Sequence, residues 1–390
     1  MLVKKKEECC GCSACKSICP KQAISMEPDV LGFLYPKIDE KKCINCGLCE
    51  KVCSFNDSYD ISLNFSEPLA FGVRHRNMKE IETSRSGAAF IALSDWILDN
   101  GGSVYGAGYK DHFRVAHKRA QTKTERDEFK GSKYVQSDVG DCFKQVKEDL
   151  KNGLYVLFSG TPCQVAGLKS FIGRKLYEKL YLIDIVCHGV PGPYIWRDYL
   201  DYLERKEGKI ITSVNFRDKS RFGWSNHRES FQFNNTYTKT YTYTFYQNIV
   251  LRSSCAFCHF TNLKRAGDIT IADFWGWKKT NPNFNIDNKG CSLVLCNTQK
   301  GYCLFKDAQK DINFFSAKLE NCIQPNLQHP TELDPKRESF EKDYAKEGFL
   351  YVMKKYGDFG INAQTQKKIN FLKDYLKKKI KVMINKIKEW

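Results

Sequence analysis

The sequence lacks the long apolar stretches that would carry a chain across a membrane or out of the cell. Its 390 residues contain no uninterrupted run of about eighteen apolar residues, which a membrane-spanning helix requires. The first eight residues are basic and lead directly into cysteines, without the apolar segment of a secretory signal. We therefore expect a cytoplasmic chain whose eighteen cysteines stay reduced.

Several common ligand-binding signatures are also missing. No GxGxxG motif is present, so a Rossmann domain lacks its fingerprint. The net charge of +17 suits a nucleic acid, an acidic protein, a phosphorylated cofactor or an anionic membrane. Because neither an RNP motif nor a zinc-finger spacing accompanies that charge, we expect no nucleic-acid partner.

A doubled cysteine motif occupies the N-terminus. Two runs with the spacing C-x2-C-x2-C-x3-C begin at Cys9 and Cys43, which is the bacterial ferredoxin pattern. In that pattern three closely spaced thiolates bind one cluster, and the fourth cysteine binds the other. We therefore predict two [4Fe-4S] clusters. Their ligands would be Cys9, Cys12, Cys15 and Cys53 for the first, and Cys43, Cys46, Cys49 and Cys19 for the second.

Zinc binding and disulfide pairing are the alternatives for these cysteines. Structural zinc sites usually draw on two separated CxxC pairs, and disulfides need an oxidising compartment. Neither fits four cysteines within eleven residues in a chain without a secretory signal. Cys10 lies among ligands that are already sufficient, so we interpret it as a non-ligand.

The remaining sequence alternates between strand and helix patterns, which predicts an α/β fold. Short apolar runs at 154–158 and 181–186 are typical of buried parallel strands. Further strands are predicted at 70–74, 104–109, 113–118, 269–272 and 292–296, with helices at 86–98 and 140–151. Alternating Thr, Tyr and Phe predict an antiparallel insertion with strands at 212–216, 229–233 and 238–243. The predicted domains are a ferredoxin module at 1–57, a main domain at 69–330 after a polar linker at 56–68, and a helical basic tail at 331–390.

Four cysteines of the main domain are candidates for a second redox site. Cys163 follows a predicted strand and lies behind the N-cap residue Thr161, where the helix dipole favours a thiolate. Cys187 follows the next strand, and parallel strands bring their carboxyl ends to one edge. Cys255 and Cys258 form a close pair that can bind one metal. Taken separately, these residues also fit a catalytic nucleophile, a buried cysteine and half a zinc knuckle. Core packing is predicted for Cys142, Cys291, Cys296, Cys303 and Cys322.

Three loops have the small and polar residues that a flavin site needs. The first leads into a predicted helix whose amides can hold a phosphate, the second combines charge with an aromatic ring, and the third is a small strand-to-helix turn. The candidate flavin contacts are Ser84, Ser86, Gly87, Lys130, Ser132, Lys133, Tyr134, Gln136, Ser159, Gly160 and Thr161. On residue type alone, ordinary loops are the better interpretation.

The order of these motifs resembles that of a known family. The motifs are SGTPCQ at 159–164, DIVCHG at 184–189, the pair Cys255 and Cys258, and GDITIADFWG at 267–276. Together, over about 69–322, they resemble the coenzyme F420 hydrogenase/dehydrogenase beta-subunit family. The resemblance implies bound FAD contacted by the three loops, and a third [4Fe-4S] cluster held beside it by Cys163, Cys187, Cys255 and Cys258. We place His188, next to Cys187, as a proton donor near that flavin, and a structural histidine at the end of a strand is the alternative.

The resemblance leaves two function classes open. The first is an FAD and iron–sulfur oxidoreductase that reduces a small organic substrate or oxidises reduced coenzyme F420, with ferredoxin or an electron-transfer complex as its redox partner. The second is a non-catalytic subunit that only relays electrons. A zinc-stabilised binding protein would require both ferredoxin motifs to be misread.

The last segment carries a helical apolar stripe among many lysines. Residues 364–390 contain nine lysines and two acidic residues. The stripe comprises Ile369, Leu372, Leu376, Ile380, Met383 and Ile387. A surface helix packed on the main domain is the favoured interpretation, and peripheral contact with an anionic membrane is the alternative.

Overall fold

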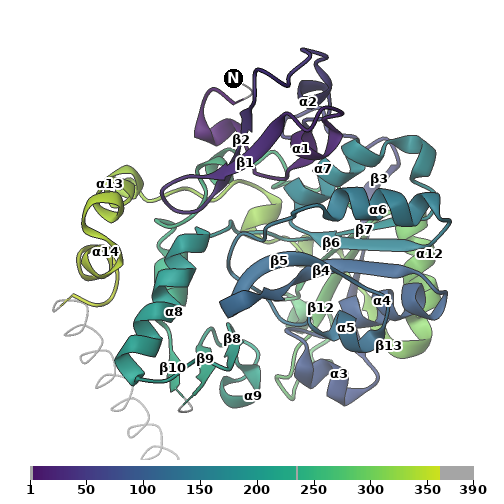
Figure 1. The fold of residues 1–390 in the computed structure, drawn as a ribbon. Helices are drawn as coiled ribbons and strands as arrows, with labels where there is room; N and C mark the ends of the chain where they lie inside the picture. The colour runs from purple at the N-terminus through teal and green to yellow at the C-terminus, as the bar shows by residue number, and fades with distance from the viewer. Residues whose placement is uncertain (1–2, 234–235, 361–390) are drawn as a thin grey trace, which may run out of the picture.

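An eight-stranded mixed sheet organises the chain after its cysteine-rich N-terminus (Figure 1). The computed structural model describes residues 3–233 and 236–360. In spatial order the strands are β13 (Ile312–Ser316), β3 (Asn64–His75), β12 (Ser292–Thr298), β11 (Ile269–Asp273), β7 (Leu180–Ile185), β6 (Val156–Gly160), β4 (Ser103–Lys110) and β5 (Arg114–Ala120). The four strands β11, β7, β6 and β4 run parallel to one another, and the flanking strands are antiparallel. The predicted α/β fold class is confirmed.

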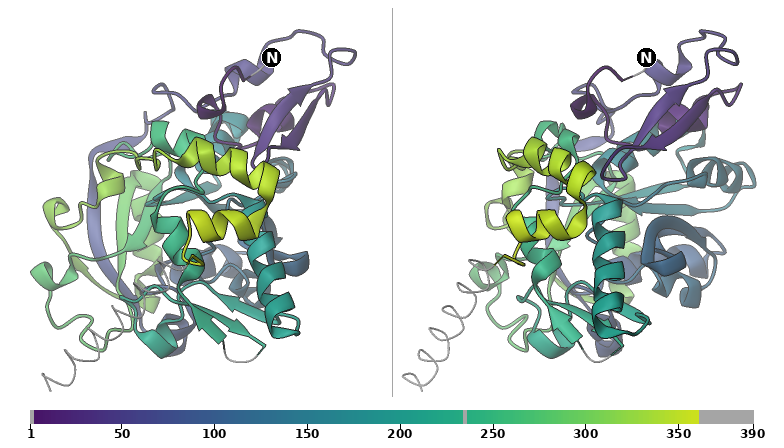
Figure 2. Two further views of the ribbon diagram at one scale, coloured as in Figure 1. Left: turned by 90° about the vertical axis from the view of Figure 1, so that its left-hand side faces the viewer. Right: turned by 60° about the vertical axis from the view of Figure 1, so that its left-hand side comes forward.

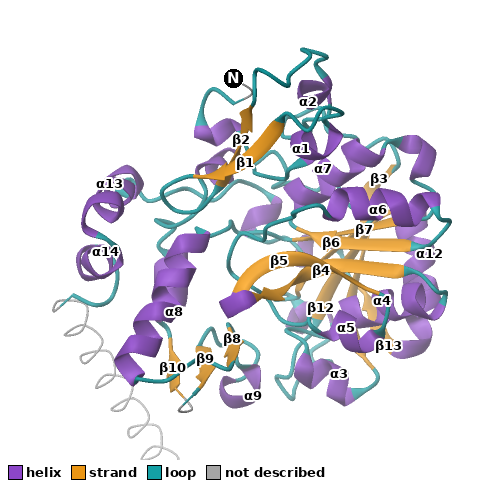
Figure 3. Cartoon of the chain, in the orientation of Figure 1, coloured by secondary structure: helices purple, strands orange, loops and turns teal. Residues whose placement is uncertain are grey.

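Helices cover both faces of this sheet (Figure 3). Phe158 and Leu182 face α6 (Cys142–Lys151) and α7 (Pro162–Ile172), whereas Leu157 and Ile183 face α4 (Ala89–Asp99) and α12 (Gln299–Asp307). Successive strand residues point to opposite faces, so a strand buried on both faces must be apolar throughout. This explains why the central strands are continuous apolar runs in the sequence. Smaller helices at the edges are α3 (Met78–Thr83), α5 (Lys123–Asp127) and α11 (Trp277–Thr280).

The ferredoxin module sits directly on α7 (Figure 1). It contains α1 (Ala14–Ile18), the antiparallel hairpin β1 (Ile24–Pro28) and β2 (Leu34–Ile38), and α2 (Leu48–Lys51). Ala14 shares an apolar core with Val165 of α7. A Cβ atom added at Gly167 would lie 2.7 Å from the Cys12 Sγ, so glycine is what allows α7 to approach the cysteines this closely.

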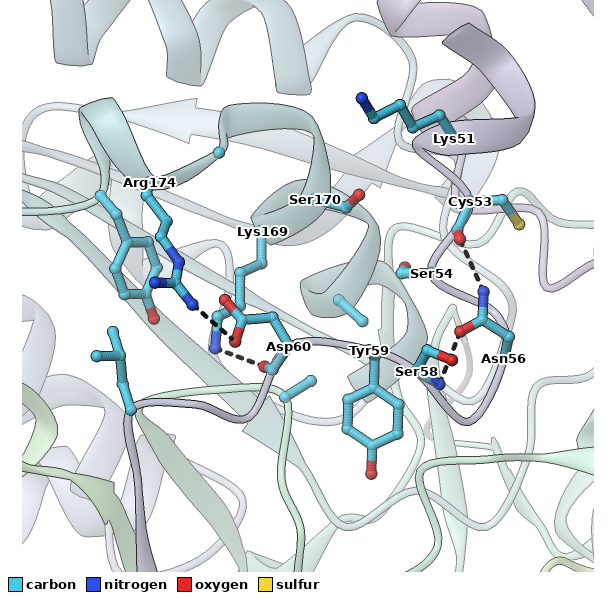
Figure 4. A pocket seen from close by; sticks show the side chains of 15 residues that line it. Lys51, Cys53, Ser54, Asn56, Ser58, Tyr59, Asp60, Lys169, Ser170 and Arg174 are labelled. Atoms are coloured by element: carbon cyan, nitrogen blue, oxygen red, sulfur yellow. Dashed lines mark hydrogen bonds and ion pairs between the residues drawn. The ribbon is translucent and has the colours of Figure 1, made fainter. Parts of the chain in front are cut away.

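The segment after the module is shorter than the predicted linker at 56–68, because β3 already begins at Asn64. It is held against α7 rather than hanging free (Figure 4). The Lys169 Nζ donates a hydrogen bond to the Asp60 carbonyl at 2.8 Å, and the Tyr59 ring lies 4.7 Å from that of Phe260. A cavity of about 310 Å³ lies along this junction, between Cys53 and Arg174.

The predicted antiparallel insertion is present but smaller than expected. It forms β8 (Ser213–Asn215), α9 (Lys219–Phe222), β9 (Glu229–Gln232), β10 (Thr236–Thr238) and α10 (Thr240–Tyr246). The predicted strand at 238–243 is wrong, because the chain turns into α10 at Thr240. Tyr241 and Phe245 are spaced four residues apart, and as one face of a helix both become buried.

A helical layer ends the described chain. α13 (Arg337–Glu347) and α14 (Phe349–Lys355) lie beside α8 (Pro193–Glu207) (Figure 2), with Phe349 packed near Tyr199 and Tyr202. No helix among residues 3–233 and 236–360 is long and apolar enough to span a membrane. The predicted apolar stripe at 364–390 lies outside the described residues.

Candidate functional site

The cysteines predicted for the first cluster lie together in the ferredoxin module. Burial and the nearby thiolates of Cys12, Cys9 and Cys53 raise the pKa of Cys15. Burial raises the pKa of Cys53, and the charge of Cys12 adds to that shift. Cys53 comes from the second motif, so the fold brings it to the first three cysteines, as the ferredoxin pattern predicts.

The cysteines predicted for the second cluster lie toward the outer end of the module. Burial raises the pKa of Cys49, with a further contribution from Cys46. Cys46 is exposed, and Ile44 and Leu48 beside it are 55% and 39% exposed. Cys19 accepts a hydrogen bond from the Ala23 N–H at 3.3 Å. This end of the molecule therefore presents both cysteines and apolar side chains to solvent.

The four cysteines of the main domain also converge. Burial and the charges of Cys255, Cys163 and Cys258 raise the pKa of Cys187 well above its usual value. Burial and the charge of Cys163 raise the pKa of Cys258 to about 12. Loops after β6, after β7 and before β11 supply these residues, so the carboxyl edge of the parallel strands gathers them.

The local structure around Cys163 favours its thiolate form. It lies in the first turn of α7, behind Thr161 and Pro162. The Thr161 Oγ1 is 3.2 Å from the Cys163 Sγ, and the Thr161 N–H donates to the Gln164 Oε1 at 3.1 Å. Hydrogen bonding with Cys10, followed by that with Thr161, lowers the pKa of Cys163 to about 7. The predicted N-cap at Thr161 thus positions the sulfur at the helix N-terminus.

Cys10 and Arg252 lie between two of the three cysteine sets. The first set is Cys9, Cys12, Cys15 and Cys53, the second is Cys43, Cys46, Cys49 and Cys19, and the third is Cys163, Cys187, Cys255 and Cys258. The Cys10 thiol is buried and faces both Cys12 and Cys163. Arg252 is 1% exposed, and it donates hydrogen bonds to the Cys9 carbonyl at 2.8 Å and to the Gln136 Oε1 at 2.8 Å. Its charge acts on thiolates of both sets. The ferredoxin module and the main domain therefore meet at their sulfur sites.

Sequence reasoning missed Arg252, and only its position three residues before Cys255 could have drawn attention to it. Its guanidinium also stacks 4.2 Å from the Tyr35 ring and donates to the Leu34 carbonyl at 3.0 Å. Gln136, which is also a predicted flavin contact, joins the two domains, because its Nε2 donates to the Cys10 carbonyl at 2.8 Å.

The first predicted flavin loop packs against the antiparallel side of the sheet. The Ser86 Oγ donates to the Cys291 carbonyl at 2.8 Å, and a Cβ atom at Gly87 would lie 2.1 Å from the Val73 carbonyl oxygen. The Ser84 Oγ is buried and finds no hydrogen-bond partner among the described residues. The loop is thus fixed by packing and hydrogen bonding, and the Arg85 Nε and Nη1 are likewise buried without hydrogen-bond partners among the described residues.

The second predicted loop turns its lysines toward protein groups. Lys130 forms ion pairs with Glu80 at 2.6 Å and Asp127 at 2.9 Å. The Lys133 Nζ donates to backbone carbonyls of its own loop, and burial lowers its pKa to about 7. Ser132 is half-buried between them. Tyr134 points elsewhere, with its hydroxyl 3.3 Å from the Arg217 Nη1.

The third predicted loop and His188 lie beside the third cysteine set. His117 is buried, and its Nε2 is 3.0 Å from the Ser159 carbonyl, next to Gly160. The His188 Nε2 is 2.7 Å from the Asn248 Oδ1, and its ring lies 5.7 Å from that of Tyr246. His188 therefore has a fixed orientation one residue after Cys187.

Family models match both halves of this arrangement. Residues 154–320 match the model for the C-terminal part of the coenzyme F420 hydrogenase/dehydrogenase beta subunit, and residues 8–56 match a 4Fe-4S dicluster domain. A solved chain of the F420-reducing [NiFe] hydrogenase complex from Methanosarcina barkeri, studied as a xenon derivative, is similar at 16% identity and a TM-score of 0.47. That alignment covers 77% of this chain and 96% of the other. A comparison with curated proteins gives no match.

The two matched ranges contain all twelve cysteines of the three sets. The dicluster match supports the iron–sulfur assignment over zinc or disulfides for the N-terminal motifs. The chain is thus an iron–sulfur redox protein that is related to the coenzyme F420 hydrogenase/dehydrogenase beta subunit over residues 154–320 and contains a 4Fe-4S dicluster domain at residues 8–56.

Proposed function

We propose that the chain is an FAD-dependent iron–sulfur oxidoreductase that exchanges electrons between a redox partner protein and a small organic substrate. The observation that carries this proposal is the direct contact between the dicluster domain and the third cysteine set, through Cys10, Arg252 and Gly167. A module that only stabilised the fold would have no need to place its sulfurs at this boundary.

The third set fits an iron–sulfur cluster by the chemistry of its donors. Cys163, Cys187, Cys255 and Cys258 supply four thiols at one place, and soft thiolate ligands select iron–sulfur clusters or zinc. The adjacent dicluster domain favours iron, since electrons entering that domain need a redox-active acceptor nearby. Thr161 and the N-terminus of α7 favour the thiolate form of Cys163.

The flavin site is proposed around the first and third loops. Ser84 has a buried hydroxyl without a hydrogen-bond partner among the described residues. This donor suits a phosphate of FAD, while Gly160 and Thr161 lie beside Cys163. When bound, FAD exchanges a hydride with an organic molecule and single electrons with iron–sulfur clusters.

His188 is the group that we propose to move a proton at this site. The Asn248 Nδ2 donates to the Glu332 carbonyl at 2.9 Å, so its Oδ1 faces His188 and fixes the proton on Nε2. The Thr331 hydroxyl donates to the His188 carbonyl and holds the backbone. The same Thr331 Oγ1 lies 3.4 Å from the His188 Nδ1, the ring nitrogen that does not face Asn248.

The test is anaerobic purification followed by quantification of iron, sulfide and flavin. We expect about twelve irons for three clusters and one FAD per chain. Reduced ferredoxin and reduced coenzyme F420 are then screened as electron donors. A fully reconstituted sample with about eight irons would remove the third cluster. Absence of flavin would favour the alternative of a non-catalytic relay subunit.

A further inference from the structure

Two buried arginines near the end of β11 have more donors than the protein satisfies. The Arg217 Nη1 is 2.6 Å from the Asp273 Oδ2, and the Arg85 Nε is 3.9 Å from the same oxygen. Arg217 is only 5% exposed. Within the described part of the chain, the Arg217 Nε and the Arg85 Nε and Nη1 are buried without hydrogen-bond partners. Unpaired donors on a buried charged group are costly, so they indicate a missing acceptor.

The charge around these arginines is also unbalanced. Asp273 faces both guanidinium groups, and its other carboxylate oxygen accepts a hydrogen bond from the Trp224 Nε1 at 2.9 Å. Lys219 adds a third basic side chain whose Nζ donates to backbone carbonyls, including that of Ser86 at 3.0 Å. Burial and the Arg85 charge lower the pKa of Lys219 to about 7. Burial and the charges of Arg217 and Arg85 lower the pKa of His227 to about 3. The site therefore has a positive field that an anion would neutralise.

Aromatic side chains mark the solvent side of this site. Trp275 and Tyr246 are 44% and 47% exposed, and Trp275 stacks on Trp224 at 4.7 Å between ring centroids. The Arg217 guanidinium lies 5.6 Å from the Trp275 ring. Tyr246 connects the site to the third cysteine set, because its ring lies 5.7 Å from that of His188. Arg217, Arg85 and Lys219, which we call the cationic cluster, are thus within reach of solvent and beside the proposed redox site.

We propose that Arg217 and Arg85 bind a carboxylate or phosphate group of the organic substrate, so that this enzyme acts on an anionic molecule. The inference rests on the proposed function. Guanidinium groups suit these anions because their planar N–H donors match the oxygen pairs of a carboxylate or phosphate. Arg217 belongs to the insertion, whereas Arg85 belongs to the first flavin loop. The same chemistry could therefore come from the pyrophosphate of FAD.

The experiment measures binding of inorganic phosphate and of acetate by isothermal titration calorimetry, with and without saturating FAD. The proteins are the full-length chain, Arg217→Gln, Arg217→Lys and the control Arg205→Gln. Arg205 is an exposed arginine of α8 whose Nε donates to the Asp201 carbonyl, so its replacement removes the same charge elsewhere. We expect both anions to bind whether or not FAD is present. Arg217→Gln should weaken binding at least tenfold, Arg217→Lys should weaken it less, and Arg205→Gln should have no effect.

The outcomes distinguish an anionic substrate from the pyrophosphate of FAD as the ligand of the arginines. They also distinguish failure of this inference from failure of the proposed function. If FAD abolishes phosphate binding to the unmodified chain, the arginines hold the flavin and the inference is overturned. The same conclusion follows if Arg217→Gln loses FAD, or if it binds both anions as tightly as the unmodified chain. The competition between FAD and phosphate needs no variant, so it decides the matter even if Arg217→Gln fails to fold. A chain that binds anions but no flavin would keep the anion site and contradict the proposed function.

Discussion

At the scale of single residues, Arg252 is the group with the clearest electrostatic consequence. A buried cation beside Cys9, Cys12, Cys163 and Cys255 favours the more negative, reduced state of whatever cluster these thiolates hold. We expect Arg252→Gln to make the reduction potentials of the first and third clusters more negative, by about 60 mV for each 1.4 kcal/mol of lost interaction. The potential of the second cluster should not change. Redox titration followed by EPR checks this.

Arg252→Lys is the matched variant, because it retains the charge but loses the fork of hydrogen bonds. It should restore most of the potential. An equal shift of all three clusters in Arg252→Gln, or no shift in any of them, would contradict the electrostatic role.

Replacement of Cys258 tests whether the third cysteine set binds a cluster. Because Cys258 belongs to the set gathered around Cys187, Cys258→Ser should lose about four irons and leave the dicluster signal intact. Cys322→Ser is the control, since Cys322 is buried in a separate apolar cluster. Iron analysis and EPR distinguish the results. Equal iron in Cys258→Ser and the unmodified chain would mean that Cys258 is not a ligand.

At the scale of elements, the close approach of α7 to the ferredoxin module depends on Gly167. A valine there would place atoms against the Cys12 side chain, 2.7 Å from Sγ and 3.0 Å from Cβ. We expect Gly167→Val to destabilise the docked module by about 1–3 kcal/mol, the usual range for overpacking. Thermal unfolding and limited proteolysis after residue 57 measure the effect. Ser170→Val, exposed on the same helix, should be nearly neutral.

Elements also show what the sequence could and could not reveal. The ferredoxin motif is local, so cysteine spacing was sufficient to predict the dicluster module. Leu157 and Ile183 lie in strands buried on both faces, so continuous apolar runs were sufficient to predict these strands. The segment after Thr238 was misassigned because alternation of Thr and Tyr fits a strand as well as one face of a short helix. Arg252 and Arg217 were missed because their roles depend on contacts far away in the sequence. No periodicity reports such contacts.

At the scale of the whole molecule, the second and third cysteine sets have different surroundings. The second set lies beside the exposed side chains of Ile44 and Leu48, whereas the third lies next to the cationic cluster and its exposed aromatic rings. We infer that the redox partner contacts the surface beside the second set and the substrate the surface beside the third. Transient redox complexes have small interfaces, so a few exposed apolar residues can determine them.

We therefore expect Ile44→Glu combined with Leu48→Glu to slow electron exchange with reduced ferredoxin at least tenfold, since both apolar contacts would become charged and hard to desolvate. Iron content, FAD content and turnover with a small artificial electron donor should be unchanged. Stopped-flow reduction of the anaerobic protein provides the measurement. The matched control is Ile286→Glu, an equally apolar residue that is 76% exposed and remote from the ferredoxin module in the sequence. If the double variant and the control accept electrons from ferredoxin at the same rate as the unmodified chain, the partner enters elsewhere, and the assignment of the partner to the second set loses its support.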